Sequence, residues 1–391
     1  MYEIMSADEA IRLIRDGDCI CVNSFVGIEN PTELHEALYR RYQKMQSPTH
    51  LTIVSSAGFG VWDDEHNAQG YIREGAVDKL ICGHFGAMMS TKKLVLEDRF
   101  EAYNLPLGCI SHAIRAQAGG LPGALSKVGL DIFVDPRREG PGINRISIDD
   151  SLVKHVEVDG DEFLYYKLPK ITIAMIKGTA ADRKGNITFD DMFMSGDALS
   201  ICQAVKANRG KVIVQVDRLV ATPSRPRNAI IPGCLVDAIV VAEPQERNEA
   251  YTALTGGFEI PYKEWHTWNE KINDLSQKQR KNNIPANIIG KRAAQELRVD
   301  DIVNIGIGIP ETVARFARKS GMLDMITLTV ESGGIGGFPV SGEAFGAMIG
   351  AASVYDMANQ FDLYDNGGLD VCFMGALEVD KYGNINAHRG T

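Results

Sequence analysis

The sequence predicts an α/β fold built from two tandem open domains with largely parallel sheets. Short apolar runs rich in β-branched residues recur along the chain, and helical segments separate several of them. The order strand, glycine turn, helix also occurs twice, which suggests an internal duplication. With 391 residues the chain is long enough for two cores, because a domain commonly takes about 150 residues.

The first half is expected to alternate helices and strands. Residues 1–18 alternate in charge and predict an amphipathic helix, and residues 19–25 predict a strand. Asn30 is expected to cap the next helix, with Pro31 as its first residue and Glu33 as the acid of a capping box. Further apolar runs predict strands at 51–54, 80–81, 132–134, 171–176, 212–216 and 238–241.

The composition changes at residues 243–288, which are polar and hold two of the three tryptophans. We expect this stretch to be a surface connector. It would join an N-terminal domain at 1–242 to a C-terminal domain at 289–391.

The second domain restarts the pattern with a strand at 301–305, a glycine turn and a helix that Pro310 opens. The turn motif Asp-x-x-Gly-Asn at 182–186 also returns at 380–384. In the first copy two strong strands follow this turn, whereas the second copy stops shortly after it. We therefore expect a shortened, incomplete second domain, with a partner chain as one possible source of the rest.

Composition narrows the class of protein. The chain has 41 Lys and Arg against 51 Asp and Glu, a net charge of −10, which argues against a nucleic-acid partner. Its seven cysteines are scattered without a CxxC motif, so we expect reduced thiols, a cytoplasmic protein and no metal site. No apolar run approaches the roughly 20 residues of a membrane span, so no membrane partner is expected.

Glu331 is the candidate catalytic residue. It follows the apolar run Ile326–Val330, which predicts a buried strand, and it precedes a glycine-rich stretch at 333–337. Ligands of open α/β sheets bind at the carboxyl ends of strands, so this position would present one glutamate as a nucleophile. The alternative is a strand end whose carboxylate forms a surface salt bridge.

Long, ordered stretches resemble family I coenzyme A transferases. The resemblance is closest to the single-chain acetate/propionate (short-chain acyl) CoA transferases and more distant to succinyl-CoA:3-oxoacid CoA transferase. It covers nearly the whole chain. The stretches that carry it include SFVG at 24–27, EAYNLPLGCISHAIR at 101–115, GLPGALSKVGLDIFVDPR at 121–137, NIGIGIPE at 304–311, TVESGGIGGFPVSG at 329–342 and QFDLYDNGGLDVCFMG at 360–375.

The resemblance implies ping-pong transfer of CoA between a short-chain acyl-CoA and a small carboxylic acid. Glu331 would form an acyl anhydride and then a glutamyl-CoA thioester. No cofactor beyond coenzyme A as substrate is implied. The site would lie between the domains of a homo-oligomer, a dimer or tetramer, in short-chain fatty acid or ketone body metabolism.

The resemblance also assigns the other candidate site residues. Backbone donors for the oxyanion would come from the loop at Phe25, Val26 and Gly27, with the Val26 N–H as the chief candidate. Gly333 and Gly334 would shape the pocket, and coenzyme A would bind beside Gly336, Gly337, Gly367 and Gly368. For each glycine the alternative is a tight turn.

Several positions depart from the family pattern. Glu29 and Leu107 replace a usual Gly and Gln, residues 346–350 differ from the usual GASxN, and Asn366 replaces a glycine. These departures keep two alternatives open, an acyl-CoA hydrolase and a non-catalytic acyl-CoA-binding subunit. Among cations, Lys127, Arg137 and Arg292 are candidates for the anionic parts of coenzyme A, with solvated surface as their alternative.

Overall fold

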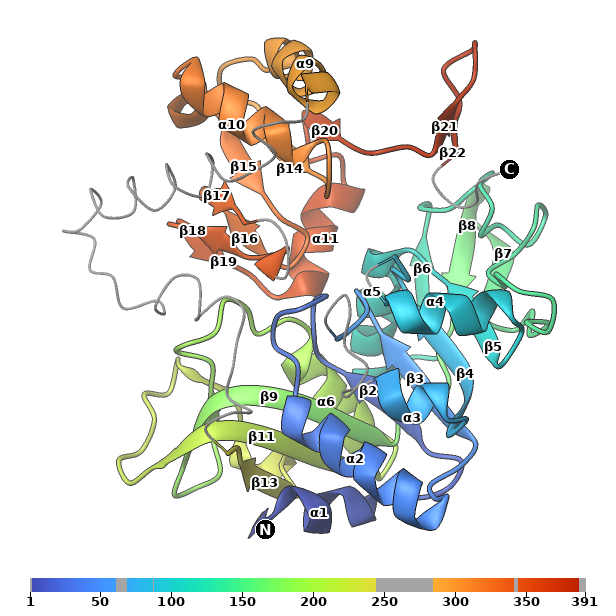
Figure 1. Cartoon of the computed structure of the whole chain (residues 1–391), viewed down its shortest axis with the longest axis vertical. Helices are drawn as coiled ribbons and strands as arrows, with labels where there is room; N and C mark the ends of the chain where they lie inside the picture. The colour runs from blue at the N-terminus through green and yellow to red at the C-terminus, as the bar shows by residue number, and fades with distance from the viewer. Residues whose placement is uncertain (1, 61–68, 87, 244–283, 341–343, 387–391) are drawn as a thin grey trace. The chain divides into compact units, whose positions relative to one another are not determined.

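The structure is a computed structural model that describes residues 2–60, 69–86, 88–243, 284–340 and 344–386. The chain divides into two compact units, Met1–Phe258 and Glu259–Thr391 (Figure 1). The division falls inside the predicted connector at 243–288, most of which lies outside the described residues. Mixed α/β architecture and a large parallel sheet confirm the predicted fold class.

The first unit is built on a parallel sheet. Its strand order is β1-β13-β11-β9-β2-β3-β4-β5, and every neighbouring pair along this path is parallel. The short strands β10 (Ile187–Thr188) and β12 (Ala229–Ile231) join it antiparallel. The main strands are β1 (Glu3–Met5), β2 (Cys19–Val22), β3 (Leu51–Ser55), β4 (Val77–Cys82), β5 (Glu101–Asn104), β9 (Ile173–Asp182), β11 (Lys211–Val220) and β13 (Ala238–Val241).

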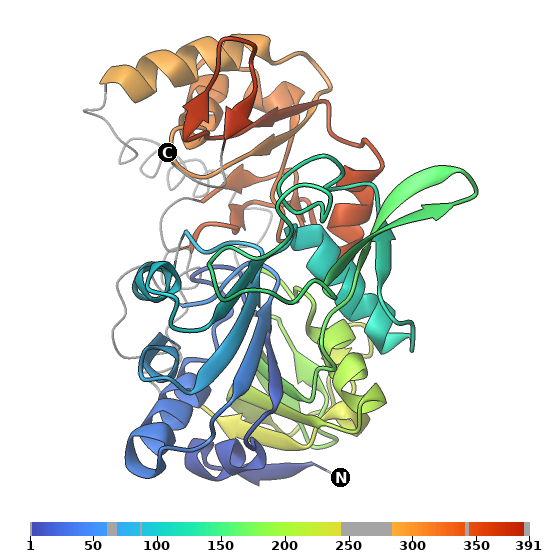
Figure 2. The ribbon, with the colours of Figure 1, turned by 90° about the vertical axis from the view of Figure 1, so that its right-hand side faces the viewer.

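Each face of this sheet has its own apolar core, because successive strand side chains point to opposite faces. On β9, Ala174 and Ile176 pack into one core, and Ile173 and Met175 pack into the other. Figure 2 shows helices on both sides of the strands. One core includes α5 (Leu107–Ala118) and α6 (Ala198–Ala207), and the other includes α1 (Ala7–Ala10), α2 (Thr32–Met45), α3 (Gln69–Arg73) and α4 (Met89–Leu96).

The N-terminal prediction was wrong in part. Instead of one helix, residues 3–5 form β1, which pairs parallel with β13. A short α1 follows, opened by a capping box of Ser6 and Glu9, and a 3-10 helix, η1, covers Ile11–Leu13. Residues 3–5 form a strand because the sheet edge offers hydrogen-bond partners to their backbone groups, which an isolated helical turn cannot supply.

The predicted helix cap at Asn30 was also wrong. The helix α2 begins at Thr32, and the side-chain oxygen of Gln215 on β11 accepts hydrogen bonds from the N–H groups of Glu33 (3.0 Å) and Leu34 (3.4 Å). A residue distant in sequence thus satisfies the free donors of the helix start. This leaves the Asn30 side chain for another role.

The apolar run at 132–134 forms turns, although a strand was expected. Val134 is buried, and the neighbouring Asp135 carboxylate closes the turn with Arg137, whose Nη2 lies 2.7 Å from Oδ2. One buried side chain therefore accounts for the apolar signal. The three-stranded antiparallel sheet of β6 (Ala124–Ser126), β8 (Asp161–Tyr166) and β7 (Val153–Val158) was not predicted, although Asp159-Gly160 between two strand-like runs is typical of a hairpin turn.

The second unit has a smaller sheet of order β19-β16-β15-β14-β20 (Figure 1). The three strands β15, β14 and β20 are parallel, and β16 and β19 are antiparallel. Its elements are α9 (Ile284–Ala293), β14 (Ile302–Ile305), α10 (Glu311–Lys319), β15 (Thr327–Thr329), β16 (Gly334–Ile335), β17 (Phe338–Pro339), β18 (Met348–Ile349), β19 (Ser353–Val354), α11 (Met357–Asp365), β20 (Val371–Phe373), β21 (Glu378–Val379) and β22 (Ile385–Asn386). Further 3-10 turns are η2 (Gly233–Leu235), η5 (Ala294–Glu296) and η6 (Leu323–Met325).

The two units repeat one arrangement. The parallel trio β9-β2-β3 in the first corresponds to β20-β14-β15 in the second. The Asp-x-x-Gly-Asn turns repeat in their hydrogen bonds as well: Asp182 N–H donates to Asn186 O (3.1 Å), and Asp380 N–H donates to Asn384 O (3.0 Å). Such agreement in order and in local geometry supports an internal duplication.

The two turns differ in how far neighbouring segments of the chain bury them. Asp182 is buried, and its carboxylate also accepts from the Ser224 N–H (2.9 Å). Burial alone would raise the pKa of Asp182, but the hydrogen bonds it accepts outweigh this and hold it at about 2. Gly233 approaches so closely that a Cβ there would collide with the Lys184 carbonyl oxygen. Asp380, by contrast, is exposed.

Candidate active site

Glu331 occupies a tight turn directly after β15. The Gly333 N–H donates to the Val330 carbonyl (3.1 Å), and the Val330 N–H donates to the Gly334 carbonyl (2.9 Å). Gly333 has φ 118, and a Cβ there would collide with the Tyr355 carbonyl oxygen. Only glycine fits this position, so a tight turn accounts for Gly333, and its role in shaping a pocket stays a prediction.

Three parallel strands place a row of side chains beneath this turn. Asn304 on β14 is in register with Thr329 on β15 and with Cys372 on β20. Residues in register on parallel neighbours point to the same face, and Glu331, two residues after Thr329, continues that face. The sheet therefore brings a hydroxyl, an amide and a thiol together near the carboxyl group of Glu331.

Tyr364 of α11 joins this row into a hydrogen-bonded network. Its hydroxyl donates to Thr329 Oγ1 (2.8 Å) and accepts from Asn304 Nδ2 (3.4 Å). Cys372 Sγ donates to Asn304 Oδ1 (3.4 Å). Burial and the charge of Glu331 raise the pKa of Tyr364, so its hydroxyl stays protonated at neutral pH.

The carboxyl group of Glu331 is desolvated. Its Oε2 atom is enclosed and has no hydrogen-bond partner among the described residues. Burial raises the pKa of Glu331, and its own backbone N–H and the Asn304 amide oppose this rise only in part. A carboxylate that water solvates poorly is a stronger nucleophile and base than one on an open surface.

The glycines assigned to coenzyme A fall in two other places. Gly336 and Gly337 line a hollow of about 260 Å³ together with Arg318, and Glu331 is not among the described residues that line it. Gly367 and Gly368 end α11: their N–H groups donate to Tyr364 O (3.0 Å) and Leu363 O (2.9 Å). Termination of the helix explains this second pair, and coenzyme A binding at all four glycines stays a prediction.

The loop after β2 lies in the first unit and carries a strained residue. Val26 has φ 53, a left-handed conformation that is unfavourable for a β-branched side chain. Phe25 and Ile28 close the loop by two hydrogen bonds between their backbones (3.1 and 3.0 Å), and Gly27 lies between them. Such local strain persists only where the surrounding structure holds it.

Asn30 holds this loop. Its Nδ2 donates to the Val26 carbonyl (2.9 Å), and its Oδ1 accepts from the Gly60 N–H (3.0 Å). Ser24 Oγ adds a third tie to the Gly58 carbonyl (3.1 Å). The Asn30 side chain, which the sequence predicted as a helix cap, is therefore a clamp between two loops at the carboxyl edge of the sheet.

Glu29 is fully buried, with φ 59, and its Oε1 accepts from the Met194 N–H (3.2 Å). A charged group in such a position usually needs several partners. Leu107 is the first residue of α5, beside Gly83, where a Cβ would come within 3.1 Å of it. Both departures from the family pattern are thus built into the packing of the first unit.

Each of the three cations considered for coenzyme A forms an ion pair with a carboxylate of the protein. Lys127 pairs with Asp161 (3.1 Å), Arg137 with Asp135, and Arg292 with Glu296. In the part of the chain that the structure describes, no group of three His, Cys, Asp or Glu side chains is arranged to hold a metal ion. No helix among the described residues is long and apolar enough to cross a membrane.

The sequence predicted part of this site and missed the rest. It found Glu331 and its turn, but it overlooked Asn304, Tyr364 and Cys372. A signal existed for Asn304, since it lies one residue before the end of a strand that leads into the glycine turn at 306–308, at the same edge where Glu331 was expected. The residues Phe25, Val26 and Gly27 belong to the other unit, and a site between the domains stays a prediction.

An enclosed carboxyl group at the carboxyl edge of a parallel sheet, in a chain of two duplicated α/β units, defines an α/β enzyme with a candidate carboxylate nucleophile. Comparison with known proteins assigns its family. The model of the family described as coenzyme A transferase matches residues 4–242 and 286–388. The chain belongs to this family, and the protein is a CoA transferase.

Several relatives are similar over the whole chain. The acetate CoA-transferase YdiF of Escherichia coli (strain K12) is 38% identical over 99% of this chain and 71% of that protein. The caffeate CoA-transferase of Acetobacterium woodii is 35% identical over 100% of this chain and 73% of that protein. A crystal structure of the E. coli O157:H7 acyl-CoA transferase YdiF, a thioester complex with CoA, has a TM-score of 0.85 at 34% identity and covers 100% of this chain and 72% of that one.

Replacing Glu331 by Gln is expected to stabilise the protein. The raised pKa means that the folded state retains the proton more readily, so the wild type loses stability as pH rises from 4.5 through the higher folded value. Above that window the melting temperature of Glu331→Gln should exceed the wild-type value by about 2 °C.

The difference in melting temperature between Glu331→Gln and the wild type should shrink once the pH falls below 4.5, where both side chains are neutral. Differential scanning calorimetry across pH measures it, with the exposed Glu157→Gln on β7 as control. A Glu331→Gln variant that melts below the wild type at neutral pH would contradict a desolvated carboxyl group.

Cys372 should report the charge of Glu331. Burial and the Glu331 carboxylate raise the pKa of the Cys372 thiol to about 11. In Glu331→Gln the electrostatic contribution is gone, so alkylation of Cys372 by iodoacetamide at about pH 8 should quicken about fivefold. Peptide mass spectrometry follows the rate, and the exposed Cys234 of the other unit serves as the internal control. Equal acceleration at both thiols would argue against a direct effect.

Proposed function

We propose that this CoA transferase moves coenzyme A between a short-chain acyl-CoA and a small carboxylic acid through a glutamyl-CoA thioester on Glu331. The observation that carries the proposal is the desolvated carboxyl group of Glu331 in its glycine-closed turn. The substrate class rests on the resemblance to acetate and propionate transferases. The names of two relatives, an acetate and a caffeate CoA-transferase, support a carboxylic acid as acceptor.

The chemistry balances without an external acid, base or cofactor. A carboxylate oxygen of Glu331 attacks the thioester carbonyl and the C–S bond breaks. This step releases CoA thiolate and forms an acyl-glutamyl anhydride. The thiolate then attacks the glutamyl carbonyl, releasing the first acid and forming the glutamyl-CoA thioester. A second carboxylate attacks that thioester, and the thiolate returns to the new acyl carbonyl, which restores Glu331.

Neighbouring groups support these steps in different ways. The network of Asn304, Tyr364 and Thr329 fixes the sheet face from which Glu331 projects, and the glycines 333 and 334 keep bulk away from the turn. Each tetrahedral intermediate carries an oxyanion that needs a fixed donor. We assign the Val26 N–H to this role, because its strained loop is held by three side-chain hydrogen bonds.

A covalent trap tests the central step. The protein is mixed with acetyl-CoA, treated with borohydride or hydroxylamine, and analysed by intact mass and peptide mapping. We expect one modification, at Glu331, and none in Glu331→Gln. A folded wild-type protein that turns over acetyl-CoA without a modified Glu331 would rule out the covalent route.

The same assay separates the alternatives. A transferase releases the thioester-bound CoA only when an acceptor acid is present, whereas a hydrolase releases it in water. A binding-only subunit would show no turnover in any variant. A homo-oligomer, either a dimer or a tetramer, and a cytoplasmic location complete the proposal, and light scattering of the purified protein tests the first.

Asn30→Ala tests the proposed oxyanion donor. Loss of the clamp should loosen the Val26 peptide and lower kcat by about 10- to 100-fold with little change in KM, as for a donor used only in the transition state. The matched control is Asn208→Ala, which removes an amide bonded to Gln117 and Ile171 outside this loop. Equal losses of kcat in both variants would assign Asn30 to general stability.

A further inference from the structure

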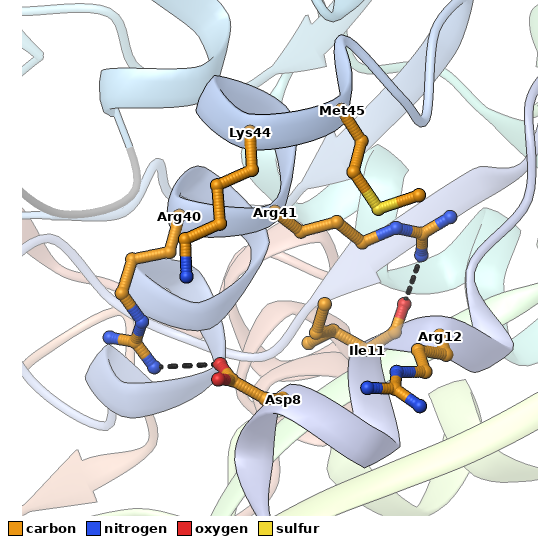
Figure 3. A pocket seen from close by; sticks show the side chains of 7 residues that line it. All are labelled: Asp8, Ile11, Arg12, Arg40, Arg41, Lys44 and Met45. Carbon is orange, nitrogen blue, oxygen red and sulfur yellow. Dashed lines mark hydrogen bonds and ion pairs between the residues drawn. The ribbon is translucent and has the colours of Figure 1, made fainter.

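A basic hollow lies on the first unit, and none of its lining residues belongs to the candidate active site (Figure 3). It has a volume of about 460 Å³ and lies between α1, η1 and the last turns of α2. Four of its seven lining side chains are cationic and one is acidic. The whole chain has a net charge of −10, so this concentration of positive charge runs against its composition. The cations are Arg12, Arg40, Arg41 and Lys44.

Two of the guanidinium groups are fixed in place by the protein. Arg40 Nη2 pairs with Asp8 Oδ1 at 2.9 Å. Arg41 Nη1 donates to the carbonyl of Ile11 in η1 (2.6 Å), as Figure 3 shows, and to the carbonyl of Ile14 just after η1 (2.9 Å). A guanidinium has five N–H donors, and these contacts use one nitrogen of each group, so both keep donors for a ligand. Fixed forks of this kind suit the bidentate binding of phosphate.

The other two cations, Arg12 and Lys44, have fewer contacts with the protein's own polar groups. Neither Arg12 nor Lys44 makes an ion pair with the described residues, although Glu9 and Asp16 lie close enough to interact with this group. Burial and the neighbouring charge of Arg12 lower the pKa of Arg41, and Asp16 opposes this. Arg12 and Arg41 are therefore close enough to repel each other, and a bound anion would add to the compensation that Asp16 already gives.

The hollow also has an apolar side. Met45 is 68% exposed at its rim, and the buried Ile11 lies at its base. An exposed methionine beside fixed arginines gives a surface that can contact an organic group as well as an anion.

We propose that this hollow binds a small anion with two linked phosphate groups, either inorganic pyrophosphate or the diphosphate of a nucleotide. Four cations line the hollow, and two of them are guanidinium forks fixed by the protein, which favours an anion with several phosphate oxygens over a monocarboxylate. The enclosing helices favour a compact ligand over a flat macromolecular partner. None of the seven lining residues has a role in the proposed transfer reaction, so this proposal does not rest on it.

Isothermal titration calorimetry with pyrophosphate and with ADP tests the proposal on the full chain. The variant Arg12→Ala/Lys44→Ala removes the two cations without ion pairs and spares the structural contacts of Arg40 and Arg41. The matched control is Lys92→Ala/Lys154→Ala, which removes two exposed charges from elsewhere on the same unit. We expect one saturable site in the wild type and the control, with affinity lowered about tenfold or more in the pocket variant.

Thermal denaturation and CoA-transferase activity show that each variant is folded. Absence of saturable binding in the wild type overturns the proposal, as does equal affinity in the two double variants. Met45→Ser separates the two sources of the diphosphate. A loss of affinity for ADP alone identifies a nucleotide, whereas unchanged binding of both identifies the diphosphate itself as the recognised group.

Discussion

The enclosure of one carboxyl oxygen, Oε2 of Glu331, is the constraint on which the candidate site in the second unit depends. Glu331 sits in a turn too tight for any residue but glycine at position 333, and its Oε2 finds no partner among the described residues. Such burial destabilises the fold, so the surroundings must hold the group in place. They do this through the in-register row of Thr329 and Asn304 and through Tyr364 of α11, none of which neutralises the charge.

The first unit contains a parallel case in its backbone. Val26 adopts a left-handed conformation that a valine avoids, and the Asn30 amide ties its carbonyl to the loop at Gly60. Both units thus keep a locally unfavourable feature at the carboxyl edge of a parallel sheet. In both, distant segments of the chain supply the hydrogen bonds that maintain it, which is the usual relation between strain and function.

Sequence patterns correctly predicted the structural features that residues adjacent along the chain determine. The fold class followed from alternating runs, and the Glu331 turn followed from a strand, an acid and a run of glycines. The errors lie where a distant segment decides the outcome: Gln215 caps α2 in place of Asn30, and β13 pairs residues 3–5 into a strand. Asn304, Tyr364 and Cys372 escaped notice for the same reason, since strand register and helix packing bring them to Glu331.

The two copies of the Asp-x-x-Gly-Asn turn differ in their exposure to solvent. Around Asp182 the N–H groups of Ser224 and Gly233 donate to Asp182 and Asn186, so the hydrogen-bonded amides of this turn are expected to exchange slowly. Around Asp380 the same internal hydrogen bonds face water. Hydrogen exchange there is expected to need only a local fluctuation. The two copies of the motif are therefore expected to differ in their rate of hydrogen exchange.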